Sequence, residues 1–164
     1  MKAAKEISEK QALSMLAAQC SRGEHCSGEM LEKMRKWNLP DDAQTRVMEY
    51  LTTNHYIDDE RFARAFVRDK LCYNKWGRRK IEQALWQKHI PQDISAPILD
   101  DVEQEEWTAC LAPLLKSKRK SITARSAYEM NAKLIRFAMS RGFTMDVIRC
   151  CLDGDDAIDV FDEI

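Results

Sequence analysis

Two short groups of side chains in this sequence carry the ligands and acids that enzymes and metal sites use. The first is a run of three carboxylates at residues 58–60, which could bind a cation or act in acid–base catalysis. The second comprises Cys20, His25 and Cys26, but its spacing does not match a structural zinc site and a fourth ligand is missing. The carboxylates directly precede a predicted helix, where acidic side chains cap backbone N–H groups and offset the helix dipole. We therefore predict no metal, no cofactor and no catalytic residue.

Recognisable catalytic motifs are also missing from the sequence. It contains no glycine-rich nucleotide loop, no G-x-S-x-G turn and no H-E-x-x-H motif. The three histidines, His25, His55 and His89, fall at predicted loops or helix ends, where histidine commonly contacts terminal carbonyl groups or solvent. We predict that the protein is not an enzyme and acts by binding a partner.

The composition is typical of a folded protein of the cytosol. The 164 residues are 45% hydrophobic and 32% charged, and the formal net charge of −1 gives no general attraction to nucleic acid or anionic membrane. The first residues form no apolar signal segment, and no apolar run approaches the roughly 20 residues that span a bilayer. The six cysteines include no C-x-x-C pair, so free thiols are expected. These features predict a cytoplasmic protein without a membrane segment.

The charged residues are strongly segregated along the chain. Residues 61–90 contain nine basic side chains and two acidic ones, and a second basic run lies at residues 116–125. Acidic residues gather at 93–106 and in a C-terminal tail from residue 153. A single charge run is as often a solvated helix face as a binding surface, so both interpretations stay open. The candidate contacts with a protein partner or DNA are Arg64, Arg68, Lys70, Lys75, Arg78, Arg79, Lys80, Lys118, Arg119 and Lys120.

The first basic run has two further features of a binding surface. It surrounds a predicted turn that carries Tyr73 and Trp76, two aromatic residues expected to be exposed, and Gly77 opens the next helix. Backbone N–H groups at that helix start would add to the side-chain cations and favour a phosphate or carboxylate. If about five phosphates were contacted, the affinity would fall with salt at a log–log slope of about −4.5. The acidic tail could compete for this surface or serve as a solubilising end.

Apolar residues recur at helical spacing along nearly the whole chain. Ser8 and Gln11 form a capping-box pattern that opens the first predicted helix. Asp41 opens a later helix whose apolar positions include Tyr50. Pro113 lies within another helical pattern and is expected to kink or end that helix. The periodicity predicts an all-α protein.

A longer period is superimposed on the helices. An apolar triplet recurs after 51 residues and again after 53, each time at a predicted helix end that is followed by Pro or Thr and then Asp. The copies are Met30, Met34 and Leu39, then Ile81, Leu85 and Ile90, then Leu134, Ala138 and Phe143. This period predicts an elongated tandem array of three three-helix repeats that complete their cores by stacking. The predicted repeats span residues 1–56, 57–104 and 105–164, the last with the acidic tail. Nine helices in a bundle without internal symmetry are the alternative.

Residues 54–67, with the sequence NHYIDDERFARAFV, closely resemble the signature of the RecX family. The resemblance continues through WGRRKI at residues 76–81 and RGFT at 141–144, and it covers about residues 50–152. It implies tandem three-helix units, in agreement with the period found above. The sequence departs from the family pattern at residues 72–76, at Pro113 and in the acidic tail.

The resemblance implies a regulator of the RecA recombinase. Such a protein binds the RecA filament on single-stranded DNA, lodges in its groove and inhibits strand exchange and ATP hydrolysis, and it thereby regulates DNA repair. The resemblance also implies that the signature is mainly structural, with Asp58 as a helix cap and with Phe62 and Ala63 in the core. The signature residues are Ile57, Asp58, Asp59, Arg61, Phe62, Ala63, Gly77, Gly142 and Phe143.

Two other functions are compatible with the residues. The chain could be a stand-alone helical nucleic-acid-binding protein that tracks phosphates with its basic middle unit, or a plain helical scaffold. Direct DNA contact within the recombinase complex is a further possibility. We expect a monomer with no membrane partner.

Overall fold

The computed structural model describes residues 6–152, and the regular structure in this range is entirely helical. The all-α fold expected from the periodicity is confirmed. In chain order, the helices are α1 (Glu9–Arg22), α2 (Ser27–Lys36), α3 (Asp41–Thr53), α4 (Asp59–Asp69), the π-helical turn η1 (Lys70–Asn74), α5 (Arg78–Gln87), α6 (Gln92–Asp100), α7 (Gln104–Ser121), α8 (Ala127–Ser140) and α9 (Met145–Cys151).

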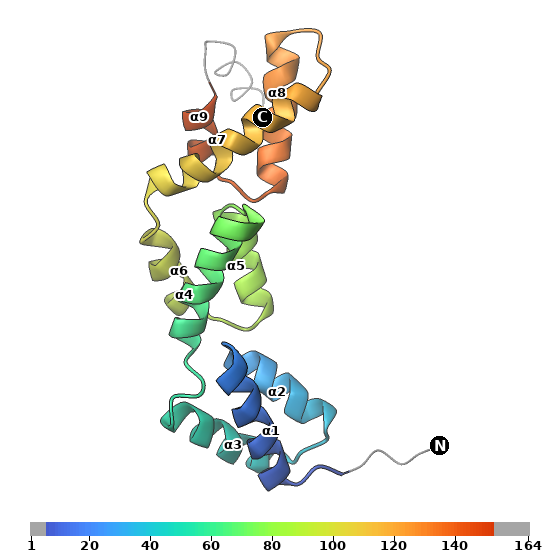
Figure 1. The fold of residues 1–164 in the computed structure, drawn as a ribbon, viewed down its shortest axis with the longest axis vertical. Helices are drawn as coiled ribbons and strands as arrows, with labels where there is room; N and C mark the ends of the chain where they lie inside the picture. The colour runs from blue at the N-terminus through green and yellow to red at the C-terminus, as the bar shows by residue number, and fades with distance from the viewer. Residues whose placement is uncertain (1–5, 153–164) are drawn as a thin grey trace, which may run out of the picture. The chain divides into compact units, whose positions relative to one another are not determined.

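The chain divides into two compact units. The first contains residues 1–66 and 85–95, and the second contains residues 67–84 and 96–164. In the first unit, α3 packs against α1 and α2 (Figure 1). In the second unit, α7 packs against α8, α9 and η1 (Figure 1). The repeat boundaries after residues 56 and 104 stay a prediction, and the acidic tail lies outside the described residues.

The helix ends in the same way at all three predicted triplets, and α3 has a similar end, where His55 has positive φ and the Tyr56 N–H donates to the Leu51 carbonyl (2.9 Å). Each of α2, α5 and α8 is followed by a residue with positive φ, and these residues, Asn38, His89 and Gly142, are 51 and 53 residues apart. An apolar residue then donates its backbone N–H to the carbonyl five positions earlier, as in a Schellman motif. These bonds run from Leu39 to Met34 (3.1 Å), from Ile90 to Leu85 (3.0 Å) and from Phe143 to Ala138 (3.2 Å). All nine residues of the predicted triplets are buried, so their recurrence has a structural basis.

The first unit is built around a continuous apolar core. Its buried residues are Ala12, Leu16, Met30, Met34, Leu39, Ala43, Val47, Leu51 and Ile57. Tyr50 does not join them, although the helical pattern placed it among the apolar positions. Its side chain is 47% exposed and its ring stacks on Tyr56 at a centroid distance of 6.5 Å. Val47 and Leu51 are one helical turn apart on the buried face, whereas Tyr50 lies at the edge of that face.

Signature residues hold the turn that precedes α4. The Asp58 carboxylate accepts the backbone N–H of Arg61 (3.1 Å), which is the predicted helix cap. The Arg61 guanidinium donates to the carbonyls of His55 (3.1 Å) and Tyr56 (3.3 Å) and thereby closes the turn. The buried signature residues here are Ile57, Phe62 and Ala63, as the resemblance implied for the last two.

Replacing Asp58 by alanine is expected to lower the free energy of unfolding by about 1 kcal/mol, because the start of α4 loses its capping acceptor. Asp58→Asn keeps an oxygen at the same place and should recover most of this loss. Urea denaturation followed by circular dichroism measures both variants. If Asp58→Ala and the unmodified chain unfold at the same urea concentration, the cap contributes nothing.

The start of α2 is fixed by residues that are distant in the sequence. The carboxylate of Asp59 accepts the backbone N–H of Ser27 (2.8 Å), so this signature residue caps a helix 32 positions earlier. A Cβ atom on Gly28 would lie 2.4 Å from the carbonyl oxygen of Lys88, which brings the start of α2 into direct contact with the turn after α5. The Lys88 ammonium also pairs with Glu29 (3.2 Å). We call these contacts the α2 seam.

The Glu29 carboxyl makes the α2 seam sensitive to pH. Burial disfavours its charged form, but hydrogen bonds to His25 (2.8 Å) and Lys88 (3.2 Å) outweigh burial and hold the pKa of Glu29 below its ordinary value of 4.5. Because the folded state has the lower pKa, this contribution is fully present above the unfolded value and is lost as the pH falls through the folded value.

We expect Glu29→Gln to destabilise the chain near neutral pH and to differ little from the unmodified chain at an acidic pH below the folded-state pKa of Glu29, where the native carboxyl is protonated. Urea denaturation of both proteins at the two pH values measures the difference. A stability gap of the same size at both pH values would contradict a role for the Glu29 charge.

Pro113 does not end its helix, because α7 continues through it to Ser121. The expectation of a helix end at this position is therefore wrong. The reason lies in the packing of α7, whose buried residues Trp107, Leu111 and Leu115 recur every four positions on both sides of the proline. Pro113 itself is exposed, so its ring disturbs no core contact. Burial of a continuous apolar face outweighs the one backbone hydrogen bond that proline cannot make.

Candidate partner-binding surface

A backbone seam joins the start of α5 to the turn after α8. The N–H of Gly77 donates to the Arg141 carbonyl (2.8 Å), and the N–H of Arg79 donates to the Gly142 carbonyl (2.9 Å). A Cβ atom on Gly77 would lie 2.3–2.5 Å from backbone atoms of Gly142 and Phe143, so a larger residue cannot fit without moving the backbone. We call this contact the α5 seam. It gives a structural role to the signature residues Gly77, Gly142 and Phe143.

The α5 seam occupies the helix start that the sequence suggested as an anion site. Two of the backbone N–H groups on which that prediction relied, those of Gly77 and Arg79, donate instead to the carbonyls of the α8 turn. The turn lies more than 60 residues further along the chain, so the local sequence gave no sign of it. The side chains of the region thus become more important to the anion site that we predict than its backbone.

Acidic residues from outside the first basic run balance much of its charge. The ion pairs are Arg61 with Glu24 (2.7 Å), Arg64 with Glu60 (2.9 Å), Arg68 with Glu106 (3.0 Å), Arg78 with Asp100 (2.6 Å) and Lys88 with Glu29 (3.2 Å). The hydrogen bond from Arg68 also holds the pKa of Glu106 below its ordinary value. Exposed pairs of this kind add little to the stability of the fold, but they reduce the local positive potential. Three candidate contacts, Arg64, Arg68 and Arg78, are thus engaged within the chain.

The turn after α4 presents the remaining candidates of this run. At its C-terminal end α4 passes into the π turn η1, which ends at Lys75 in the left-handed conformation (φ 57°). A π-helical turn widens the backbone locally and is often found at functional sites. Tyr73 projects from this turn with 82% of its surface exposed, as the sequence predicted. Lys75 and Arg79 are also exposed, one on each side of Trp76 in the sequence.

Two lysine side chains lie over the ring of Trp76. The backbone N–H of Trp76 donates to the Lys70 carbonyl (3.1 Å), which places the ring beside η1. The Nζ atoms of Lys70 and Lys80 lie 4.8 Å and 4.6 Å from the ring centroid. The ring is half-buried rather than exposed, because these lysines lie over it. Each cation–π contact is worth about 0.5–1 kcal/mol at such a site.

A second ring in the same unit also has two cationic neighbours. Lys118 Nζ lies 5.1 Å and Arg141 Cζ lies 5.6 Å from the centroid of Phe137. The Arg141 guanidinium also donates to the carbonyl of Asn74 at the end of η1 (3.4 Å), which links the two clusters. We call them together the cationic–aromatic surface, made of Lys70, Lys75, Trp76, Arg79, Lys80, Lys118, Phe137 and Arg141.

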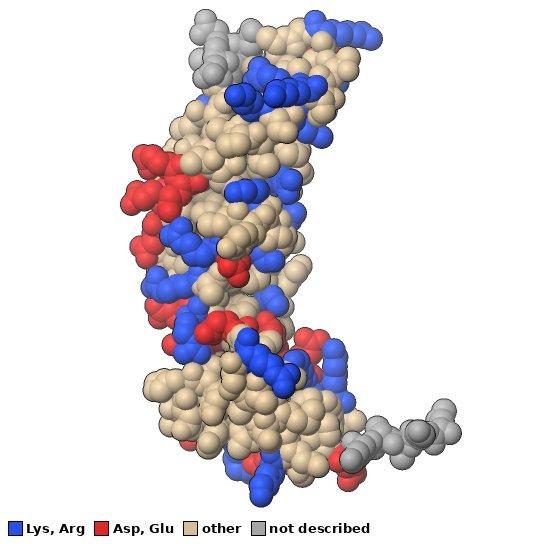
Figure 2. Space-filling view, viewed as in Figure 1, with Lys and Arg blue, Asp and Glu red and all other residues tan. Residues whose placement is uncertain are grey.

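The second basic run extends from this surface along α7. Lys116, Arg119 and Lys120 are exposed, and Figure 2 shows basic side chains over the C-terminal part of this helix. Figure 2 also shows acidic side chains gathered where α6 connects to α7, the segment that supplies the ion-pair partners of Arg68 and Arg78. Positive charge in the second unit is therefore concentrated on η1, α5, α8 and the end of α7.

Phe137 and Arg141 were not among the residues selected from the sequence. The repeat did contain a signal for Arg141. Arg141 directly precedes the positive-φ residue of its repeat, and another basic residue, Lys88, has the same place in the repeat before it, 53 residues earlier. Phe137 gave no such signal, since an aromatic residue at helical spacing more often belongs to a core.

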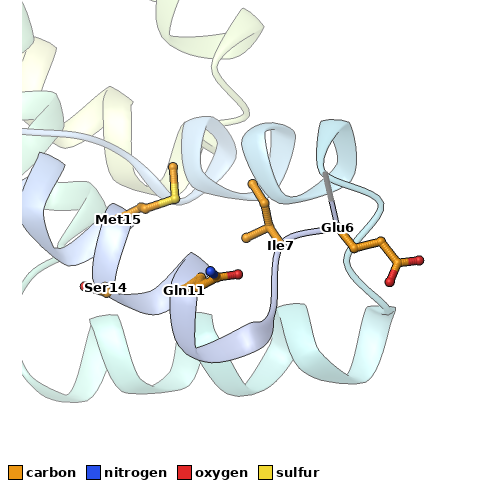
Figure 3. A pocket seen from close by; sticks show the side chains of 5 residues that line it. All are labelled: Glu6, Ile7, Gln11, Ser14 and Met15. Carbon is orange, nitrogen blue, oxygen red and sulfur yellow. The ribbon is translucent and has the colours of Figure 1, made fainter. Parts of the chain in front are cut away.

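The described residues also form two hollows. One, with a volume of about 420 Å³, lies beside α1, and Figure 3 shows the five residues that line it, Glu6, Ile7, Gln11, Ser14 and Met15. The other, of about 350 Å³, lies beside Arg78 in the second unit. Within residues 6–152, no group of three or more His, Cys, Asp or Glu side chains is arranged to hold a metal ion. No helix in the same range combines the length and apolar character needed to cross a membrane.

Comparison with models of known protein families identifies the family of this chain. A model described as the second three-helix domain of RecX matches residues 58–96, and one described as the third three-helix domain matches residues 104–152. Together the two models cover more than half of the chain. The chain belongs to the RecX family. Both matched segments include signature residues of the two seams, Asp59 in the first and Gly142 in the second.

Several curated RecX proteins are similar over most of this chain. The regulatory protein RecX of Acinetobacter baylyi is 29% identical over 143 residues, which are 87% of this chain and 87% of that protein. That of Vibrio campbellii is 28% identical over 136 residues, which are 83% and 86%. The regulatory protein RecX of Clostridium perfringens strain SM101 is 27% identical over 125 residues, which are 75% of this chain but 57% of that longer protein.

Solved RecX structures share the fold. The crystal structure of RecX from Lactobacillus salivarius superposes with a TM-score of 0.81 at 18% sequence identity, over 95% of this chain and 97% of that one. A second crystal structure of a regulatory protein RecX gives a TM-score of 0.80 at 18% identity, over 87% and 72%. The three-helix organisation of this RecX chain therefore has counterparts in RecX crystal structures.

Proposed function

We propose that this chain binds the RecA recombinase filament on single-stranded DNA and inhibits its strand exchange and ATP hydrolysis. Membership of the RecX family, whose curated members are named regulatory proteins, supports a regulatory role. The observation that carries the proposal is the cationic–aromatic surface, which presents cations and rings on a helical scaffold. Such a surface fits a partner with acidic groups, whether carboxylates of a protein or phosphates of DNA.

The proposed inhibition requires no chemistry by this chain. A protein that binds one conformation of a filament more tightly than another shifts the filament toward the bound conformation. ATP hydrolysis and strand exchange then slow because both require the filament to change state. We propose further that the chain acts in the cytoplasm, as a monomer and without catalytic activity.

Co-sedimentation tests the proposed partner. The chain is mixed with recombinase filaments assembled on long single-stranded DNA with a non-hydrolysable ATP analogue, and the filaments are pelleted. We expect the chain in the pellet with the complete filament, and much less of it with DNA alone or with recombinase alone. Equal recovery with DNA alone would favour direct nucleic-acid binding, and no recovery under any condition would contradict both functions.

Stand-alone binding to nucleic acid is the second candidate. It is favoured by the contacts of Lys70 and Lys80 with the Trp76 ring, since single-strand binding commonly combines aromatic rings with cations along the backbone path. This candidate predicts that a fluorescent oligonucleotide binds without recombinase and that binding weakens steeply with salt. Binding that does not change over a salt titration would exclude it.

A further inference from the structure

Two thiols of the second unit lie on elements that contact each other, η1 and α7. Cys72 is exposed on η1, and Cys110 is half-buried on α7. The Cys110 sulfur lies 3.5 Å from the carbonyl oxygen of Leu71. Because that carbonyl is bonded directly to the backbone nitrogen of Cys72, the Cys110 sulfur lies against the chain at the point where Cys72 begins. The two thiols are near enough for their charges to interact.

The two thiols of the pair have different surroundings. Burial raises the pKa of the Cys110 thiol, and the neighbouring cations Lys75 and Arg141 oppose this effect. Cys72 is open to solvent, where small oxidants reach it first. An accessible thiol with a second thiol close by is the arrangement in which a first oxidation product is converted to a disulfide.

The other thiols have different surroundings. Cys26 is buried in the α2 seam, and burial raises its pKa to about 11, so its thiolate is scarce at neutral pH. The Cys20 sulfur lies beside the thioether of Met30 at 4.0 Å. Cys150 and Cys151 are adjacent on α9, and adjacent residues of a helix point in different directions.

We propose that Cys72 and Cys110 are a redox-sensitive pair that a hydroperoxide converts to an intramolecular disulfide between η1 and α7. The Cys72 sulfur attacks one peroxide oxygen, the O–O bond breaks, and a sulfenic acid and one water are formed when hydrogen peroxide is the oxidant. The Cys110 sulfur then attacks the Cys72 sulfur. The S–S bond forms, the S–O bond breaks, and the oxygen leaves as a second water with the proton of Cys110. The two thiols lose two electrons and the peroxide gains them.

The bond would tie the π turn to α7. Lys70, Tyr73 and Lys75 are all on this turn or next to it, so the oxidised chain would present the cationic–aromatic surface in a different and more constrained arrangement. The proposed disulfide rests on the thiol geometry alone. Its effect on partner binding rests in addition on the proposed function.

Peptide mapping of the full chain tests the disulfide without recombinase or DNA. The chain is treated with a small excess of hydrogen peroxide, its remaining thiols are alkylated, and it is digested with trypsin without reduction. Cleavage after Lys70, Lys75, Lys88 and Lys116 places Cys72 in peptide 71–75 and Cys110 in peptide 89–116, so a bond between them links two separate peptides.

We expect the two peptides to appear as one cross-linked species that dithiothreitol separates. Cys72→Ser, an exposed and mild change, should abolish this species, whereas Cys150→Ser with Cys151→Ser should leave it intact. Oxidation of Cys72 with Cys110 still open to alkylation would overturn the proposal, and so would a link from peptide 71–75 to any other cysteine or to a second chain.

Discussion

Replacing Gly77 by alanine is expected to lower the free energy of unfolding by about 3 kcal/mol, the upper end of what overpacking a closed contact costs. The added Cβ would lie 2.3–2.5 Å from backbone atoms of Gly142 and Phe143, and backbone cannot rotate away as a flexible side chain can. Any shift that relieves this clash would also stretch the α5-seam hydrogen bonds from Gly77 (2.8 Å) and Arg79 (2.9 Å), each worth about 0.5–1.5 kcal/mol.

Gly23→Ala provides the matched control for this prediction. No atom lies within 4 Å of a Cβ at Gly23, and its φ of 179° is extended backbone that alanine adopts readily. We expect this variant to unfold within about 0.5 kcal/mol of the unmodified chain. Urea denaturation of the two variants side by side measures the difference. Equal destabilisation by both substitutions would mean that the α5 seam is not closed as described.

Reversing the charges of Lys75 and Arg79 together is expected to weaken inhibition of the recombinase at least about tenfold, because two cations of a complementary interface become repulsive anions. Both side chains are exposed, and within residues 6–152 neither forms an ion pair that the substitution would break. Arg78 is a poorer choice, since its reversal would oppose Asp100 at 2.6 Å and disturb the fold. The measurement is the protein concentration that halves single-strand-dependent ATP hydrolysis.

Lys10→Glu with Arg22→Glu is the control for charge. These residues are exposed on α1 in the first unit, and their reversal changes the net charge by the same amount. We expect this variant to inhibit like the unmodified chain. If both double variants lose inhibition equally, net charge rather than the cationic–aromatic surface determines binding.

The helical fold and its repeat could be predicted from the sequence because both depend on local or periodic signals. The spacing of Met30, Met34 and Leu39 reports a buried helix face and the turn that ends it, and the same spacing returns twice. The cap at Asp58 was likewise predictable, since its acceptor and donor are three residues apart.

The candidate surface could be predicted only in part, because its electrostatics depend on contacts between distant residues. Counting charges along the sequence gives a strongly basic run at residues 61–90. In the fold, Asp100 and Glu106 approach this run from the α6–α7 connection and form ion pairs with Arg78 and Arg68. The carbonyls of Arg141 and Gly142 that occupy the start of α5 come from still further along the chain. A sequence shows which cations are present, and the tertiary fold decides which of them are balanced.

The departure from the family pattern at residues 72–76 coincides with the π turn and with the ring that two lysines contact. Of the three departures noted in the sequence, this one lies on the surface for which we propose partner binding, whereas Pro113 does not and the acidic tail lies outside the described residues. The signature residues, by contrast, are used in turns, caps and seams.

The most direct test of this account is the rate of ATP hydrolysis by RecA recombinase on single-stranded DNA as the unmodified chain is titrated in. The account predicts that hydrolysis falls progressively and reaches a low plateau at saturation, with no hydrolysis by the chain alone. A rate that stays constant up to a large excess of the chain over recombinase would contradict it.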